Sequence, residues 1–184
     1  MPSQRRAGAG RVIEVPINPV VEPSESVLVI GYGNPQRGDD GLAWKVLDAL
    51  RAAQPRPEAP PLRLKRVHQL APELAEPASR VRAVIFVDAR ADAEAGAVSC
   101  EPVMPGAGAA SLTHSLSPQA VLLYAKRLFG HVPRAAVVTV GGAAFDHGDK
   151  LSPEVLRAIP KAARRIRSLA RLWARQPLSE PAPA

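Results

Sequence analysis

Among the acids and histidines of the chain, we single out three as candidates for metal binding or proton transfer: Asp40, Asp88 and His114. Asp40 follows a glycine-rich loop that begins at Gly31, Asp88 ends a long apolar run, and His114 lies in a polar segment before a predicted helix. Two carboxylates and one imidazole are suitable ligands for a divalent cation, and three protein ligands leave coordination positions for substrate or water. These residue types therefore predict a working site, on condition that the fold brings the three together.

The elements that must position these residues follow from the pattern of apolar side chains. Runs that are apolar throughout predict strands buried on both faces, and an alternating run such as 62–67 predicts a strand nearer an edge of the sheet. Cap residues and amphipathic spacing mark the helices. The predicted strands are 27–30, 62–67, 83–88, 98–103 and 135–140; the predicted helices are 42–53, 72–76, 118–129 and 153 onward, with Pro160 kinking or dividing the last one.

This alternation of strands and helices predicts an α/β fold, a three-layer α/β/α sandwich around a mostly parallel central sheet of about five strands. The carboxyl ends of parallel strands share one edge of a sheet, so we expect Asp40, Asp88 and His114 to converge there. The 184 residues predict a single α/β domain over 26–175, with a flexible N-terminal extension over 1–25 and a frayed tail over 176–184.

A glycine loop between a strand and a helix is also typical of nucleotide-binding proteins. The third glycine of the dinucleotide fingerprint is replaced by Gln36, and the chain has no Gly-Lys-Ser/Thr ending of a P-loop. Asp39 and Asp40 would repel a phosphate at the start of the helix. A cation suits this position better, with one of the two carboxylates capping the helix and the other pointing out of the loop; the alternative is that both are ordinary acids of a first helical turn.

Composition narrows the function classes further. The chain has no apolar run long enough to span a membrane and no signal-peptide core, so we expect a cytoplasmic protein without a membrane partner. One cysteine, Cys100, excludes an intrachain disulfide and is best explained as a small strand residue. The net charge of +7 is concentrated over 161–175, which contains one lysine, five arginines and no acid. A solvated helix face explains this better than a nucleic-acid surface, and an acidic partner surface is the alternative.

Several motifs occur together, in an order typical of one protein family. The loop reads Gly31-Tyr32-Gly33-Asn34 and then Asp39-Asp40-Gly41. The later motifs are His68-Gln69-Leu70 with Pro72-Glu73-Leu74, the run from Val84 to Asp88-Ala89, His114-Ser115-Leu116-Ser117-Pro118 with Leu128-Phe129-Gly130, and Leu151-Ser152-Pro153. In these motifs and their order, from about Val27 to Arg167, the chain resembles the hydrogenase maturation protease family.

The resemblance implies an endopeptidase that removes the C-terminal extension of a nickel-iron hydrogenase large-subunit precursor after nickel insertion. The metal-contact positions of the family fall on Asp40, Asp88 and His114, which we expect to be both the metal-binding and the catalytic residues. The nickel would be the substrate's own ion, although another divalent metal would also suit these ligands. Asp40 stands where many members have Glu, which reduces the reach of the carboxylate by one methylene.

The sequence lacks the motifs of the common serine, cysteine and zinc proteases. The chain has no Gly-x-Ser-x-Gly elbow, no Cys/His pairing motif and no His-Glu-x-x-His. What remains is an aspartyl-type, carboxylate- or metal-assisted attack of water on the scissile carbonyl. A second hypothesis uses the same residues for recognition only: a nickel-recognising chaperone or regulatory protein that binds the hydrogenase precursor without cutting it.

Overall fold

The computed structural model describes residues 23–53, 59–107 and 116–176. Within these ranges the strands are β1 (Ser24–Tyr32), β2 (Leu62–Val67), β3 (Val81–Arg90), β4 (Val98–Pro102) and β5 (Arg134–Gly141). The helices are α1 (Leu42–Ala52), α2 (Ala75–Ser79), α3 (Pro118–Phe129) and α4 (Pro153–Ala174), and two 3₁₀ turns are η1 (Gly38–Gly41) and η2 (Pro72–Leu74). Most of the predicted extension and tail lies outside the described residues, so the predicted domain bounds stay predictions.

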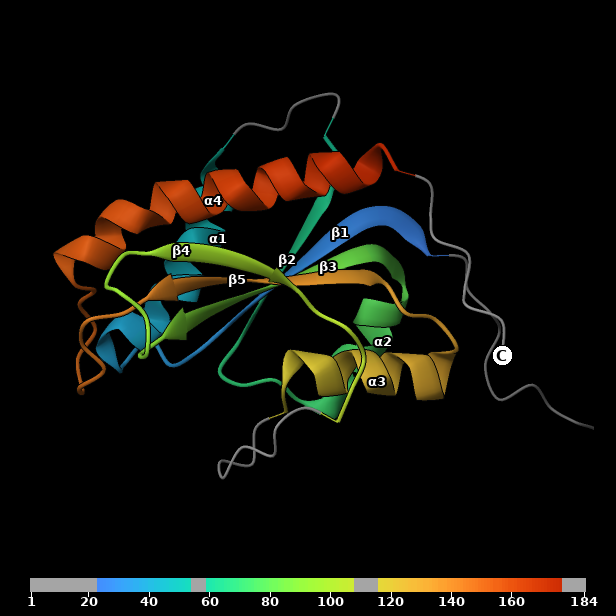
Figure 1. The fold of residues 1–184 in the computed structure, drawn as a ribbon, viewed down its shortest axis with the longest axis horizontal. Coiled ribbons are helices and arrows are strands. Elements are labelled where there is room, and N and C mark those ends of the chain that lie inside the picture. Colours follow the sequence, from blue (N-terminus) through green and yellow to red (C-terminus); the bar gives the residue numbers. More distant parts are fainter. Residues whose placement is uncertain (1–22, 54–58, 108–115, 177–184) are drawn as a thin grey trace, which may run out of the picture.

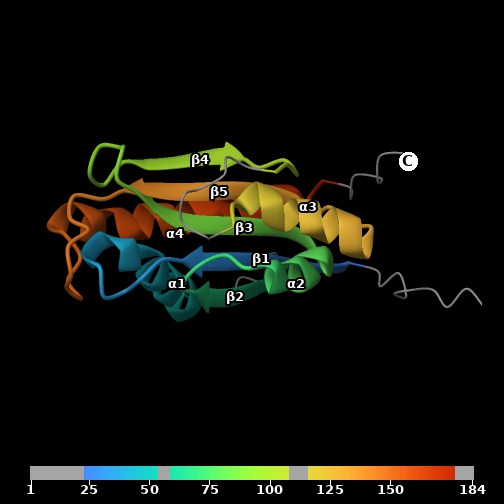
Figure 2. The same ribbon diagram turned by 90° about the horizontal axis from the view of Figure 1, so that it is seen from below.

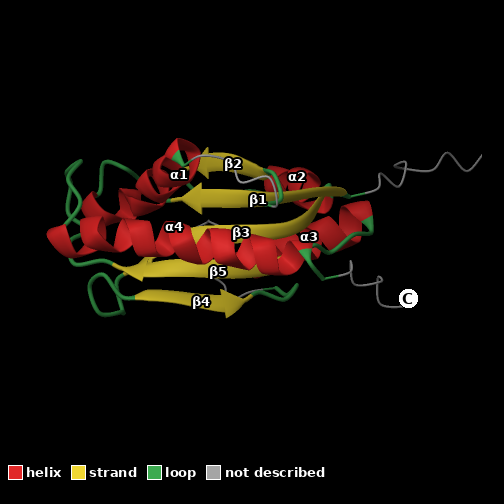
Figure 3. Cartoon of the chain, turned by 90° about the horizontal axis from the view of Figure 1, so that it is seen from above, coloured by secondary structure: helices red, strands yellow, loops and turns green. Residues whose placement is uncertain are grey.

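The strands form one sheet in the order β2-β1-β3-β5-β4, which Figures 2 and 3 show from its two sides. β1, β2, β3 and β5 are parallel, whereas β4 runs antiparallel to β5. The predicted positions within the sheet are confirmed: β2, with its alternating pattern, is an edge strand, and β3, buried over its first seven residues, is central.

Helices cover both faces of this sheet, so the predicted three-layer α/β/α architecture is confirmed (Figure 1). Alternate residues of each strand enter different cores because successive side chains point to opposite faces. Val27 and Val29 pack on the side of α1 and α4, whereas Leu28 and Ile30 pack on the side of α2 and α3. Both cores consist of buried, mainly aliphatic side chains, with Phe86 in the core of the α2 and α3 side.

The order of the strands creates a topological switch point between β1 and β3, at one edge of the sheet. From β1 the chain passes through α1 to β2, and from β2 it passes over the opposite face, through α2, to β3 on the other side of β1. The connections therefore leave the carboxyl ends of β1 and β3 in opposite directions. In open α/β sheets, ligands bind at such a switch point.

The helix ends confirm one predicted cap and correct another. At α3, Ser117 accepts a hydrogen bond from the Ala120 N–H and Gly130 ends the helix in the left-handed conformation, as predicted. The prediction that Asp39 or Asp40 caps the first helix is wrong, because both lie in η1 and α1 then begins after Gly41 without a side-chain cap. In the described part of the chain, no helix is long and apolar enough to cross a lipid bilayer.

Candidate active site

The loop after β1 holds the Asp40 carboxylate in a defined position. Gly33 has φ +133°, and a Cβ there would lie 2.1 Å from the carbonyl oxygen of Asp40, so only glycine lets the loop close this tightly. The Asn34 N–H then donates to Asp40 Oδ2 at 2.8 Å, while Asn34 Oδ1 accepts from the Gln36 N–H at 2.9 Å. Asp40 is half-buried, and among the described residues its other oxygen, Oδ1, has no hydrogen-bond donor.

Asp88 lies at the carboxyl end of β3, the strand next to β1. It is half-buried, and the Ala89 N–H donates to its Oδ1 at 2.9 Å. Burial raises the pKa of Asp88 to about 6, the charge of Asp40 adds to the rise, and Tyr32, Ala89 and Arg90 act against it. The charge of Asp40 thus acts on Asp88, although the two residues come from different elements.

Tyr32 is the third member of this arrangement. Its hydroxyl interacts with the Asp88 carboxylate, and its pKa is raised well above the ordinary value by burial and by the negative charge of Asp88. A hydroxyl that keeps its proton beside a carboxylate can orient that carboxylate. Tyr32 was not among the predicted site residues, because a tyrosine at the end of a strand is typical of ordinary packing. The signal that could have identified it is its place between Gly31 and Gly33, at the start of the loop that carries Asp40.

A row of polar side chains continues across the sheet from Asp88. Asp88 pairs with Thr139 of β5, and Thr139 pairs with Ser99 of β4. The hydroxyls of Ser99 and Thr139 lie 2.7 Å apart. From β1 to β4 the row therefore consists of Tyr32, Asp88, Thr139 and Ser99, on the side of the sheet that carries α2 and α3.

Asp39 has a different role from its neighbour Asp40. It is fully buried, and it accepts hydrogen bonds from the N–H groups of Ala143, Ala144 and Ser152 at 2.8, 2.9 and 2.7 Å. Burial acts to raise its pKa, but the three backbone hydrogen bonds outweigh burial and lower it. Asp39 thus joins the β1–α1 loop to the β5–α4 connection, and its carboxylate is committed to the fold.

His114, the third predicted site residue, lies outside the described residues. Leu116 follows it closely in the chain; its N–H donates to the Leu70 carbonyl at 3.3 Å, and it packs on the core of the α2 and α3 side, as Tyr32 does. Within the described ranges, no group of three or more His, Cys, Asp or Glu side chains could hold a metal ion. The described part of the site therefore supplies two carboxylates, which suit a divalent cation or a proton but do not complete a coordination shell.

His68 lies near the loop without entering the polar row. His68 is exposed, and its ring contacts Trp44 in a tilted arrangement with ring centroids 5.2 Å apart and an angle of 57° between the planes. Its carbonyl accepts from the Gly33 N–H at 3.2 Å. These contacts support the loop from the β2 side and give His68 a structural explanation.

Comparison with known proteins finds matches among solved structures. No protein-family model and no curated protein matches the sequence. Solved structures do match, each over about four-fifths of this chain. A hydrogenase 2 maturation peptidase from Thaumarchaeota archaeon SCGC_AB-539-E09 matches with a TM-score of 0.58 and 20% identity, over 79% of this chain and 97% of that one. The hydrogenase maturating endopeptidase HybD from E. coli matches with a TM-score of 0.60 and 19% identity, over 80% of this chain and 93% of that one, and the [NiFe] hydrogenase maturation protease HycI from Thermococcus kodakarensis KOD1 matches with a TM-score of 0.59 and 21% identity, over 82% and 93%. The chain has the fold of these hydrogenase maturation peptidases.

Proposed function

We propose that this protein is a hydrogenase maturation endopeptidase. Its substrate would be the large-subunit precursor of a nickel-iron hydrogenase, from which it removes the C-terminal extension once nickel has been inserted. The observation that carries the proposal is the pair of carboxylates, Asp40 and Asp88, at the switch point of this particular fold. We propose that the reaction takes place in the cytoplasm.

The residues have distinct parts in the proposed reaction. Asp40 and Asp88 would bind the nickel of the precursor or activate a water molecule for attack on the scissile carbonyl. His114 would complete the set of ligands to that ion. The Asn34 N–H fixes one oxygen of Asp40, and the Tyr32 hydroxyl orients Asp88, so both carboxylates are held in place before substrate binds.

The geometry supports a division of labour between the two adjacent acids. Asp40 has one oxygen free of donors among the described residues, whereas Asp39 uses both oxygens to bind backbone N–H groups. A substitution at Asp40 or Asp88 should therefore remove activity with little loss of stability. A substitution at Asp39 should act mainly on stability.

The test compares processing of nickel-loaded and nickel-free large-subunit precursor by the purified protein, with intact mass spectrometry of the precursor as the readout. We expect the extension to be lost only from the loaded form. Asp40→Asn, Asp88→Asn and His114→Ala should each lower the cleavage rate by about a hundredfold or more. Asp146→Asn, which changes an exposed acid of the β5–α4 connection, is the matched control and should cleave normally.

Two outcomes would contradict the proposal. Cleavage that is unchanged in Asp40→Asn or Asp88→Asn would remove that residue from the site. An intact mass together with a stable complex of protein and loaded precursor would replace the peptidase by a protein that binds the precursor without cutting it.

A further inference from the structure

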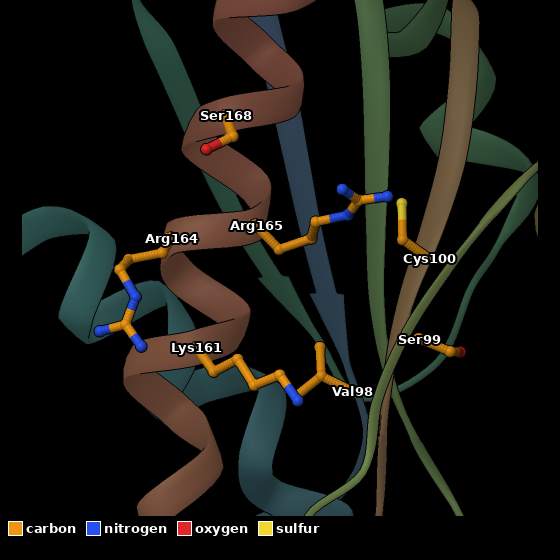
Figure 4. A pocket seen from close by; sticks show the side chains of 7 residues that line it. All are labelled: Val98, Ser99, Cys100, Lys161, Arg164, Arg165 and Ser168. Atoms are coloured by element: carbon orange, nitrogen blue, oxygen red, sulfur yellow. The ribbon is translucent and has the colours of Figure 1, made fainter.

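A groove of about 550 Å³ lies between α4 and the edge strand β4, away from the candidate active site. Val98 and Cys100 of β4 form its floor, and Lys161, Arg164 and Arg165 of α4 form its wall (Figure 4). Val98 and Cys100 are half-buried and pack on the core of the α1 and α4 side, whereas Asp88 belongs to the α2 and α3 side. The groove and the candidate active site are therefore on different faces of the sheet.

Of the cations that α4 contributes to the groove, Lys161 and Arg165 point towards β4 (Figure 4). Lys161, Arg164, Arg165 and Ser168 recur at the spacing of neighbouring helical turns, and all four are exposed. Figure 4 shows the Arg165 guanidinium directed towards Cys100 and the Lys161 side chain directed towards Val98, while Arg164 extends to the other side. Lys161 and Arg165 thus present two positive charges above an apolar floor.

These charges have no acidic partner among the described residues. Glu101, the acid of β4, interacts with Arg90, and on α4 itself Glu154 pairs with Arg157 at 2.7 Å. The lining of the groove contains no acid. Neighbouring like charges on a helix repel each other, so Lys161 and Arg165 lower the stability of the isolated protein. A bound anion would relieve this repulsion.

The spacing of the charges identifies the kind of anion. Lys161 and Arg165 are four residues apart, which corresponds to about 6 Å along a helix. Every second side chain of an extended peptide points the same way, with a repeat of about 6.5 Å. Acids at alternate positions of a peptide would therefore meet Lys161 and Arg165 in turn, while the small residues between them face Val98 and Cys100. The lining has no aromatic side chain on which a nucleic-acid base could stack.

We propose that the groove between α4 and β4 is a docking site for an extended acidic segment of a partner protein, with Lys161 and Arg165 binding two acids at alternate positions. The binding needs neither Asp40 nor Asp88, so it is independent of the proposed peptidase activity.

The probe for the test is a fluorescein-labelled peptide of four Glu-Ala repeats, with four Gln-Ala repeats as the neutral control. We expect fluorescence anisotropy to show binding of the acidic peptide only. Lys161→Gln/Arg165→Gln should weaken it by about tenfold, as expected for the loss of two charge contacts. Lys126→Gln/Arg127→Gln removes the same charge from exposed positions of α3, on the other face of the sheet, and should change binding by less than about twofold.

Cys100 gives a second readout that is specific to the groove, because it is the only cysteine of the sequence and lies on the groove floor. We expect the acidic peptide to slow its alkylation by a maleimide, and the neutral peptide to leave the rate unchanged. Circular dichroism would verify that both double variants fold.

Three results would overturn the proposal: no binding of the acidic peptide at low salt, equal weakening by the two double variants, or binding without protection of Cys100. A single-stranded oligonucleotide that binds more tightly than the peptide, and loses binding in Lys161→Gln/Arg165→Gln, would identify the groove as a nucleic-acid site instead.

Discussion

Asp39 and Asp40 are adjacent in the chain but have opposite surroundings. Asp39 is fully buried and accepts three backbone hydrogen bonds, whereas Asp40 is half-buried and accepts one, from Asn34. An ionised carboxylate suits the surroundings of Asp39 because both of its oxygens accept hydrogen bonds and neither donates one. The surroundings of Asp40 leave acceptor capacity for a ligand. We therefore expect a substitution at Asp40 to act on cleavage and one at Asp39 to act on stability.

Asp39→Asn should destabilise the protein by about 2 to 4 kcal/mol at neutral pH. The amide that replaces the carboxylate has only one acceptor oxygen, and its NH₂ group would face at least one of the backbone donors that Asp39 now satisfies. Urea unfolding of the wild type and the variant measures the difference. Asp149→Asn, an exposed position of the same connection, is the control and should leave the unfolding midpoint unchanged.

The difference in unfolding free energy between the wild type and Asp39→Asn should depend on pH. The folded-state pKa of Asp39 lies below the ordinary value of about 3.9, so its stabilising effect is complete above that value and is lost as the pH falls through the folded-state pKa. The difference between wild type and Asp39→Asn should be constant from pH 7 to about pH 5 and should shrink below about pH 4. A constant difference down to pH 2 would contradict this role of the charge.

Tyr32→Phe should reduce the proposed cleavage by about tenfold or more, in kcat rather than in KM, because it removes the hydroxyl that orients Asp88. Loss of this interaction should also raise the pKa of Asp88 above its present value of about 6, since the Tyr32 hydroxyl lowers it. Carbon-13 NMR of the Asp88 carboxyl in the metal-free protein measures the shift. The ring is retained, so an unchanged unfolding midpoint separates this effect from loss of folding.

Residue types alone allowed Asp88 to be singled out, because an acid at the end of a buried strand is rare and costly. They did not allow Asp39 to be told apart from Asp40. The partners of Asp39 are Ala143, Ala144 and Ser152, more than a hundred residues further along the chain, and they offer only backbone N–H groups. A backbone N–H leaves no trace in the pattern of side chains, so these partners of Asp39 could not be predicted. For this reason the prediction that Asp39 or Asp40 caps the first helix was wrong.

At the scale of elements, α4 shows how a helix tolerates an internal proline. The helix runs as one element from Pro153 to Ala174, so the prediction that Pro160 divides it is wrong. Pro160 has no N–H to donate to the carbonyl of Leu156, but both residues are exposed and water can reach that carbonyl. The buried face, which includes Ala158, Ala162 and Ile166, keeps the helix on the sheet on both sides of the proline.

Pro160→Ala should therefore stabilise the protein, by about 1 to 3 kcal/mol, because it restores an intrahelical hydrogen bond and removes a steric conflict. Thermal unfolding followed by circular dichroism measures the gain. Pro153→Ala is the matched control: Pro153 occupies the first turn, where the missing N–H has no intrahelical acceptor, so the midpoint should change little or fall. A lower midpoint for Pro160→Ala would mean that the proline is needed for the path of the helix.

The strands were predictable to different degrees for a physical reason. β1 and β3 are buried on both faces, so almost every position between Val27 and Ile30, and between Val81 and Val87, had to be apolar. β4 is an edge strand with exposed Ser99, Glu101 and Pro102, and its pattern was correspondingly weak. The α/β class and the central strands thus follow from the sequence, whereas the antiparallel direction of β4 depends on tertiary pairing with β5.

At the scale of the whole molecule, Arg82 connects three distant parts of the chain. It is almost fully buried, its Nη1 donates to the carbonyls of Trp173 and Gln176 at 2.6 and 2.9 Å, and its Nε lies 2.8 Å from the Glu25 carboxylate. The start of β3 is thereby joined to the end of α4 and to the start of β1. A cation also suits the carboxyl end of a helix, where carbonyl groups lack partners.

Arg82→Met should cost about 2 to 3 kcal/mol, because charged hydrogen bonds to the last carbonyls of α4 are lost from a buried position. Arg80→Met is the control, since Arg80 makes a half-exposed pair with Glu76 and should contribute less than about 0.5 kcal/mol. Urea unfolding gives the free energies, and limited proteolysis would show whether the end of α4 becomes the first site of cleavage in Arg82→Met. Equal midpoints for the two variants would contradict this role for Arg82.

The buried Asp39 also has a kinetic consequence. The amide hydrogens of Ala143, Ala144 and Ser152 all bind one carboxylate, and each can exchange with solvent deuterium only when its bond to that carboxylate opens. If the β1–α1 loop and the β5–α4 connection separate as a unit, the three amides share one opening free energy although they come from different turns of the backbone. Residues 39 and 143–152 would then form a single cooperative unit, and the frequency of its opening would limit how often the loop that carries Asp40 is rearranged.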